Sequence, residues 1–164
     1  MQYSNTAFLL IGGNIGDRRG FLNQARSLLE LHSGKEVMFS CIYETAAWGK
    51  EDQSAFLNQA LALSTTLTAE ELLKNILHAE IEIGRERREK YGARIIDIDI
   101  LFFNNEIYNL KDLVIPHQQL PYRRFALKPL AEIAPDFIHP VLNKSVVELL
   151  EECTDPLDVT VFDD

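Results

Sequence analysis

The hydrophobic pattern of the chain changes between the two-residue period of strands and the roughly 3.6-residue period of helices. Apolar or alternating segments rich in β-branched and aromatic residues predict strands at 6–11, 36–45, 56–67, 97–103, 106–108 and 157–162. Amphipathic segments predict helices that begin at 18, 69, 121 and 145. Asp17 can cap the first helix, and the sequences TAEE from Thr68 and SVVE from Ser145 are capping boxes.

The order of these elements predicts the fold class. A strand, a helix, two strands, a helix and a strand come first, and a hairpin signalled by Asn104-Asn105 and further helices follow. This order predicts an α+β, ferredoxin-like βαββαβ sandwich with a mainly antiparallel sheet, an extra hairpin and C-terminal helices. No repeat, low-complexity tract or linker interrupts the 164 residues, so we expect a single domain over residues 1–164.

Two of these elements also predict which side chains share a face. Alternation in the 36–45 strand places on one side Val37, Phe39, Cys41 and Tyr43. Helical spacing after Thr68 gives one stripe that contains Leu73, Ile76, Leu77, Glu80 and Ile81. Glu80 is then a carboxylate on a largely apolar stripe, and it is either a partner for the arginines just downstream or an edge residue that points outward.

Composition and charge narrow the class of protein. Hydrophobic residues make up 46% and charged residues 25% of the chain, as in soluble globular proteins. The net charge of −9 argues against a general binder of nucleic acid or anionic membranes. No signal peptide or membrane-spanning run is evident, so we expect a cytoplasmic protein. A monomer is the expected oligomeric state. Cys41 and Cys153 lack metal-ligand spacing, and we expect both to be core thiols.

The segment 84–103 carries the main candidate chemistry. Five basic residues lie within ten positions: Arg85, Arg87, Arg88, Lys90 and Arg94. In the strand that follows, Asp97 and Asp99 point the same way, because side chains alternate between the two faces. Paired carboxylates suit Mg²⁺, and arginines suit the phosphates that such an ion accompanies. The alternative is a pair of solvated carboxylates beside a salt-bridged helix end.

The turn GGNIGD at 12–17 joins the first strand to the first helix and resembles a phosphate loop in its position. Its spacing matches neither the dinucleotide fingerprint nor the P-loop, which needs a Lys-Ser/Thr pair. Taken alone, it is better interpreted as a tight structural turn.

Several motifs together resemble one family. These are GGNIGD, YETAAWG, FLNQALALSTTL, GRERREKYGARIIDIDILFF, and IPH followed by RRF and EIAPD. The resemblance is to the 6-hydroxymethyl-7,8-dihydropterin pyrophosphokinases, and it runs in order from residue 8 to residue 140. It implies Mg²⁺-dependent transfer of the β,γ-diphosphate of ATP to the pterin hydroxymethyl group in folate biosynthesis, with release of AMP. Two Mg²⁺ ions are expected, with ATP as co-substrate.

The resemblance also implies roles for individual residues. Asp97 and Asp99 match the metal ligands, while Arg85 and Arg94, assisted by Arg87, match the arginines that grip the triphosphate. Matching positions that contact the nucleotide are His117 and Arg123. Phe56 and Phe125 match the residues that stack on the pterin. Asn58 and the backbone around Thr45 and Ala47 match the groups that face the pterin edge. Without the resemblance, the two phenylalanines would be interpreted as core residues and the histidine as structural or exposed.

Three residues depart from the family pattern. Gly13 replaces a serine, and Ala47 and Ala93 replace prolines before Trp48 and Arg94. The two alanines are expected to loosen the loops around the substrates. Two other classes remain as alternatives: a non-catalytic module that binds a nucleotide or a partner protein, and an RNA-binding module of similar topology, which the acidic charge disfavours.

Overall fold

The computed structural model describes residues 5–46, 54–85 and 93–163. The strands are β1 (Asn5–Gly13), β2 (Lys35–Phe39), β3 (Tyr43–Thr45), β4 (Phe56–Thr65), β5 (Asp97–Phe103), β6 (Tyr108–Asn109), β7 (Val114–Ile115) and β8 (Val159–Val161). The helices are α1 (Arg18–His32), α2 (Ala69–Ile83), α3 (Arg124–Ile133) and α4 (Val146–Glu152), and a 3₁₀ turn spans Leu120–Tyr122. None of the helices in these ranges is long and apolar enough to cross a bilayer.

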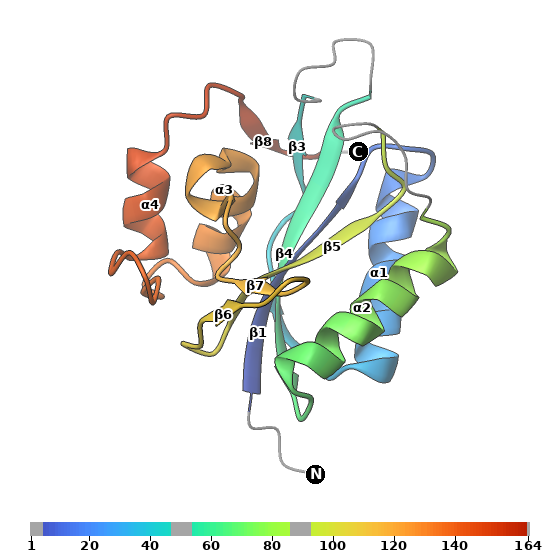
Figure 1. The fold of residues 1–164 in the computed structure, drawn as a ribbon. Coiled ribbons are helices and arrows are strands. Elements are labelled where there is room, and N and C mark those ends of the chain that lie inside the picture. Colours follow the sequence, from blue (N-terminus) through green and yellow to red (C-terminus); the bar gives the residue numbers. More distant parts are fainter. Residues whose placement is uncertain (1–4, 47–53, 86–92, 164) are drawn as a thin grey trace.

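The main sheet has the strand order β5-β1-β4-β3-β8, and β2 also pairs with β4. The pairings of β1 with β4 and β5, and of β4 with β2 and β3, are antiparallel. Because β1 lies between β4 and β5, the two halves of the βαββαβ unit interlock in one sheet, as Figure 1 shows. The predicted α+β sandwich with a mainly antiparallel sheet is therefore confirmed.

Helices cover both faces of the sheet (Figure 1). On one face, α1 and α2 bury a core to which the strands contribute Ala7, Leu9, Ile11, Leu57, Leu61, Leu63, Ile98 and Ile100. On the other face, α3 and α4 bury a second core that includes Leu10, Ala60, Leu101, Phe102, Leu127, Leu130, Val146 and Leu149. Successive residues of a strand thus enter opposite cores, which explains the continuous apolar runs at 7–11 in β1 and 60–63 in β4.

Local signals set the starts of α1, α2 and α4 as predicted, whereas α3 begins later than expected. The Asp17 side chain accepts a hydrogen bond from the Gly20 backbone N–H and caps α1. Complete capping boxes open α2 at Thr68 and α4 at Ser145. Pro121 lies in the 3₁₀ turn that precedes α3, so the helix expected from this proline begins at Arg124.

The strand predicted at 36–45 is wrong in detail, because it is broken into β2 and β3. At the break, Ser40 bonds β4 through its backbone and its hydroxyl, which accepts from the Ala60 N–H at 3.0 Å. A bulge between Glu36 and Met38 also shifts the register of β2. As a result the four side chains predicted on one side separate: Tyr43 is buried, whereas the other three are exposed, namely Val37, Phe39 and Cys41. Cys41 is therefore not a core thiol, while the buried position of Cys153 is confirmed.

The predicted buried face of α2 is also wrong, by a rotation about the helix axis. Ile76 is buried as expected, but Leu77 and Ile81 are 40% and 72% exposed. Their places in the core are taken by Ala69, Leu72, Ala79 and Ile83. Apolar residues surround much of this helix, so periodicity alone permits more than one stripe, and packing against α1 and β5 selects the actual one.

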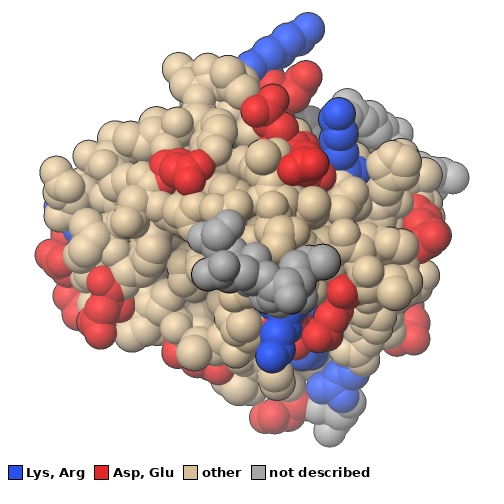
Figure 2. Space-filling view, turned by 90° about the horizontal axis from the view of Figure 1, so that it is seen from below, with Lys and Arg blue, Asp and Glu red and all other residues tan. Residues whose placement is uncertain are grey.

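The extra hairpin is present, but it forms between β6 and β7 and not directly after β5. Asn104 makes the expected turn, with a positive φ of 50°. The strand after it begins at Tyr108 and pairs with Val114–Ile115. Figure 2 shows one face of the molecule, on which acidic side chains are scattered and no broad basic surface is visible among the described residues.

Candidate active site

The two carboxylates of β5 lie on the same face of the sheet. Asp97 and Asp99 are partly exposed, whereas Ile98 and Ile100 between and after them are buried in the core under α1 and α2. Asp99 is paired with Leu10, which belongs to the opposite core, so both carboxylates point to the side that α3 covers. The period-two prediction for this pair is confirmed.

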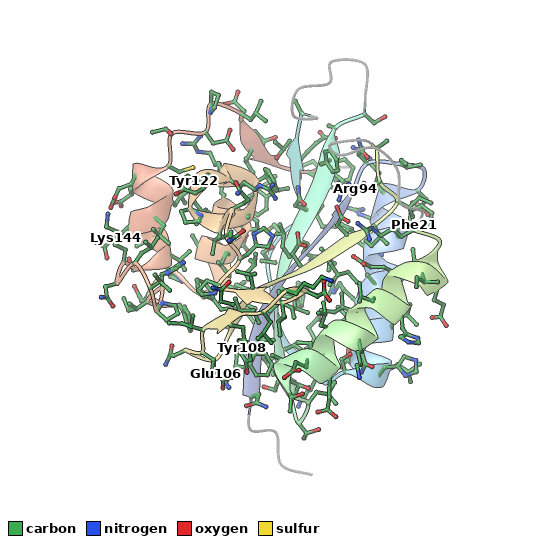
Figure 3. The ribbon with its side chains drawn as sticks, viewed as in Figure 1. Phe21, Arg94, Glu106, Tyr108, Tyr122 and Lys144 are labelled. Carbon is green, nitrogen blue, oxygen red and sulfur yellow. The ribbon has the colours of Figure 1, made fainter. Side chains whose placement is uncertain are left out.

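Two arginines converge on Asp97. Arg85 Nη2 lies 3.1 Å from Asp97 Oδ1, and Arg94 Nη1 donates to Asp97 Oδ2 at 2.9 Å. Arg85 comes from just beyond the C-terminal end of α2. Arg94 precedes the first residue of β5 and is labelled in Figure 3. The structure therefore brings together the two predicted arginines and one of the two predicted carboxylates. Arg87, Arg88 and Lys90 lie outside the described residues.

Glu80 lies behind this cluster and is almost fully buried, at 5% exposure. Its Oε2 accepts the Ile98 backbone N–H at 2.8 Å, and its Oε1 lies 3.5 Å from Arg85 Nη1. Burial raises the pKa of Glu80 to about 7, although the hydrogen bond from Ile98 and the charge of Arg85 act in the opposite direction. Of the two alternatives for this residue, the structure supports the partner of an arginine.

Burial and the neighbouring charge of Asp99 raise the pKa of Asp97, and Arg94 and Arg85 oppose that rise. A carboxylate held beside a second carboxylate in a partly buried place would be stabilised by a bound cation. Arg85 provides a sign of an anion site, because its Nε is buried and has no hydrogen-bond partner among the described residues. An anionic oxygen would satisfy this donor.

His117 and Arg123 border the same group of charges. Burial lowers the pKa of His117, Arg123 lowers it further, and Asp99 opposes both effects. The His117 Nδ1 accepts the Gln119 backbone N–H at 3.1 Å, so the neutral ring carries its proton on Nε2. Arg123 occupies the N-cap position of α3 without a capping hydrogen bond from its side chain, and its guanidinium lies 5.6 Å from the centre of the Phe125 ring. The structure therefore places His117 within electrostatic reach of Asp99.

The residues predicted to bind the pterin lie on the same face of the sheet. Register places Asp97, Gly12 and Asn58 in one row across β5, β1 and β4. Neighbouring strands are about 4.8 Å apart, so Asn58 and Asp97 lie about 10 Å from each other across Gly12. A β-carbon on Gly12 would lie only 2.1 Å from Asn58 Oδ1, which shows that the buried amide covers this glycine. Phe56 lies two residues before Asn58 on the same side of β4.

Thr45 pairs with Phe56 across β3 and β4, and it is buried. Its hydroxyl has no hydrogen-bond partner among the described residues. Phe125 is half-buried in the first turn of α3, where it packs against the second core. Ala47 and Trp48 lie outside the described residues, and Ala93 is half-buried directly before Arg94.

Sequence reasoning from the residues alone missed the part that the 12–17 turn has in this site. Gly12 lies under Asn58, and the side chain of Asn14 bonds to the backbone of Arg94. The only available signal was the resemblance of the GGNIGD motif, because a turn of this composition looks structural by itself.

Comparison with known proteins decides the family. A sequence model of 7,8-dihydro-6-hydroxymethylpterin-pyrophosphokinase (HPPK) matches residues 8–135. The chain belongs to the HPPK family. It is 42% identical over 149 residues to an Aquifex aeolicus protein named 2-amino-4-hydroxy-6-hydroxymethyldihydropteridine pyrophosphokinase, covering 91% of this chain and 92% of the relative. The protein of that name from Bacillus subtilis is 44% identical over 131 residues, with 79% and 78% covered.

Solved structures with the HPPK fold agree with the topology. A Plasmodium falciparum HPPK-DHPS structure superposes with a TM-score of 0.74 at 21% identity, over 90% of this chain and 43% of that one. A second HPPK-DHPS structure, in complex with substrates, gives a TM-score of 0.72 at 19% identity, again over 90% and 43%. This chain therefore spans less than half of the length of those two chains, and the likeness to them shows the fold alone.

Proposed function

We propose the residue roles by which this chain carries out the reaction of the HPPK family. That reaction is ATP-dependent pyrophosphoryl transfer to hydroxymethyldihydropterin in folate biosynthesis, and it follows from membership of the family. One observation carries the proposed roles: Asp97 and Asp99 share a face, and the arginines on either side of the 86–92 segment both reach Asp97.

The donor set fits a divalent cation. Two carboxylates on one face offer hard oxygen ligands, and a bound cation would offset the burial and the Asp99 charge that raise the pKa of Asp97. We assign Asp97 and Asp99 as ligands of the two Mg²⁺ ions expected for this reaction. When bound, the ions would supply positive charge that offsets the charge on the phosphate oxygens.

The arginines supply the rest of the phosphate site. In the structure Arg85 and Arg94 both pair with Asp97, so their guanidinium groups are already gathered where a triphosphate would meet the carboxylates. We propose that phosphate oxygens take over as acceptors for Arg85, whose Nε is otherwise unsatisfied among the described residues, and for Arg94. Arg87 is proposed to assist, and His117 and Arg123 to contact the nucleotide.

The pterin is proposed to bind on the other side of Gly12 from Asp97. Its flat ring suits stacking between Phe56 and Phe125, and its edge suits the Asn58 amide and the backbone around Thr45 and Ala47. The row from Asp97 to Asn58 supports this arrangement, because it places the carboxylate and the amide on one face with a side-chain-free residue between them. Phosphoryl transfer then depends mainly on positioning and on charge neutralisation.

The experiment is an assay of AMP formation from ATP and 6-hydroxymethyl-7,8-dihydropterin across a MgCl₂ titration. Asp99→Asn removes one proposed ligand without breaking the ion pairs of Asp97 with Arg85 and Arg94, and Asp136→Asn is the matched control on an exposed carboxylate. We expect Asp99→Asn to lower kcat/KM at least about 100-fold and to require more Mg²⁺. We expect the Asp136→Asn variant to behave like the wild type.

Unchanged turnover and Mg²⁺ dependence in Asp99→Asn would contradict the metal assignment. The non-catalytic module is tested separately, by isothermal titration of the wild type with a non-hydrolysable ATP analogue, with and without Mg²⁺. If the ATP analogue binds with the same affinity with and without Mg²⁺ and the pterin, and no AMP is formed from ATP, that module would be favoured over the enzyme.

A further inference from the structure

The side chain of Asn14 connects two parts of the site that are far apart in sequence. Asn14 follows β1 in the 12–17 turn and is 3% exposed. Its Oδ1 accepts the Arg94 backbone N–H at 2.8 Å, and its Nδ2 donates to the Ser54 carbonyl at 3.0 Å. The Asn14 backbone N–H also donates to the Arg94 carbonyl, at 2.8 Å. One residue therefore fixes both Arg94 and Ser54.

Both ends of this connection matter for the proposed chemistry. Arg94 is a proposed triphosphate ligand, and its backbone is held from both sides by Asn14. Ser54 lies two residues before Phe56, the proposed stacking residue, and four before Asn58, the proposed partner of the pterin edge. The distance between the phosphate side and the pterin side of the site is thus set in part by a single amide.

The packing around the turn leaves little freedom for alternatives. A β-carbon on Gly13 would lie 2.2 Å from the Ile95 carbonyl oxygen, so the 94–95 segment lies directly against the turn. Arg18 provides a second tie on the pterin side, because its Nη1 donates to the Ala55 carbonyl at 2.8 Å and to Glu44 Oε2 at 2.9 Å. Asn14 is the described side chain that bonds to both segments.

The chemistry of the two bonds specifies an amide. The contact with Arg94 needs an acceptor and the contact with Ser54 needs a donor, and asparagine presents both on one short side chain. Aspartate would keep the acceptor but would place a carboxylate oxygen against the Ser54 carbonyl. Alanine would leave the Arg94 N–H and the Ser54 carbonyl without these partners.

We propose that Asn14 is a positioning residue for pyrophosphoryl transfer, which holds the Arg94 backbone and the strand that carries Phe56 and Asn58 at the separation the reaction needs. The inference rests on the proposed residue roles. Transfer requires reacting atoms within about 3.5 Å, and a misplacement of about 1 Å costs about 100-fold in rate. Loss of Asn14 therefore lowers kcat more than it weakens the binding of either substrate.

The test compares Asn14→Ala and Asn14→Asp with Asn5→Ala as a matched control. Asn5 lies at the other end of β1, where its Nδ2 donates to the Leu67 carbonyl at 2.8 Å and its Oδ1 accepts from Asn104 at 2.9 Å. Asn5→Ala therefore removes the same kinds of bond away from the site. For each variant, kcat, the KM for ATP, the KM for the pterin and the urea unfolding midpoint are measured.

We expect Asn14→Ala to lower kcat about 10- to 100-fold with less than about threefold change in either KM. Asn14→Asp should also lower kcat, because it keeps only the Arg94 bond, and it carries the test if the alanine variant does not fold. Asn5→Ala should lose stability with kcat unchanged.

Three results would overturn the role of Asn14 while leaving the proposed function intact: an equal kcat loss in Asn5→Ala, a rise in KM at constant kcat in Asn14→Ala, or wild-type kcat in Asn14→Asp. If the wild-type protein forms no AMP, the proposed function fails first and the role of Asn14 in it fails with it.

Discussion

Replacement of Glu80 by glutamine should make the protein more stable at high pH, although it removes a partner of Arg85. Glu80 is 5% exposed, and its pKa is raised from an ordinary value of 4.5 to about 7, with burial as the largest cause. The charges that surround it are Arg85, Asp97 and Asp99. Because the pKa is higher in the folded state, the folded protein binds the proton more tightly than the unfolded chain does.

The sign and size of the effect follow from this difference. Below pH 4.5 the carboxyl group is protonated in both states, and stability falls as the pH rises from there to about 7. Each pKa unit is worth about 1.4 kcal/mol, so the full loss is about 3 kcal/mol. Between pH 5 and pH 8 the expected change is about 2 to 3 kcal/mol. Glutamine has nearly the same shape, stays neutral, and can still accept the Ile98 N–H.

The assay is urea unfolding of wild type and Glu80→Gln at pH 5 and pH 8 in the presence of a chelator. The free energy of unfolding of Glu80→Gln relative to wild type should rise by about 2 to 3 kcal/mol over that interval. Glu82→Gln, on the exposed side of the same helix, should follow the pH dependence of the wild type. Parallel pH curves for wild type and Glu80→Gln would show that burial does not penalise the Glu80 charge, and the reasoning would be wrong.

Two further predictions concern packing. Ile76→Ala should lower the free energy of unfolding by about 2 to 5 kcal/mol, because Ile76 is fully buried. Ile81→Ala should lower it by less than about 0.5 kcal/mol, because Ile81 is 72% exposed, and comparable losses in urea unfolding would contradict the orientation of α2. Gly13→Ala should cost about 1 to 3 kcal/mol by the same measurement, because its β-carbon would meet the Ile95 carbonyl oxygen at 2.2 Å; wild-type stability would show that the 94–95 segment moves away freely.

The parts of the fold that were predictable from sequence depend on local chemistry. A capping residue such as Thr68 satisfies backbone donors within its own turn, so the start of α2 is visible in four residues. The shared face of Asp97 and Asp99 follows from the two-residue period of one unbroken strand. Neither feature requires knowledge of the partner elements.

The parts that were not predictable depend on contacts with distant segments. The break at Ser40 is made by bonds to Ala60, twenty residues away, and nothing within 36–45 announces it. The face of α2 is decided by α1 and β5, because the helix sequence offers two apolar stripes. For the same reason the sequence permits two interpretations of Glu80, and only its contacts with Arg85 and the Ile98 N–H distinguish them.

The site begins where the side chains of the central strand end. β1 is buried on both faces through Ile11, and then Gly12 and Gly13 remove the side chains from two successive positions. The Asn58 amide lies over Gly12, and the Ile95 carbonyl lies against Gly13. A larger residue at Gly12 would fill the space between Asn58 and Asp97, and one at Gly13 would push away the segment that carries Arg94. The glycine pair that ends the core is therefore also what lets the Asn58 amide and the segment that carries Arg94 lie so close to the central strand.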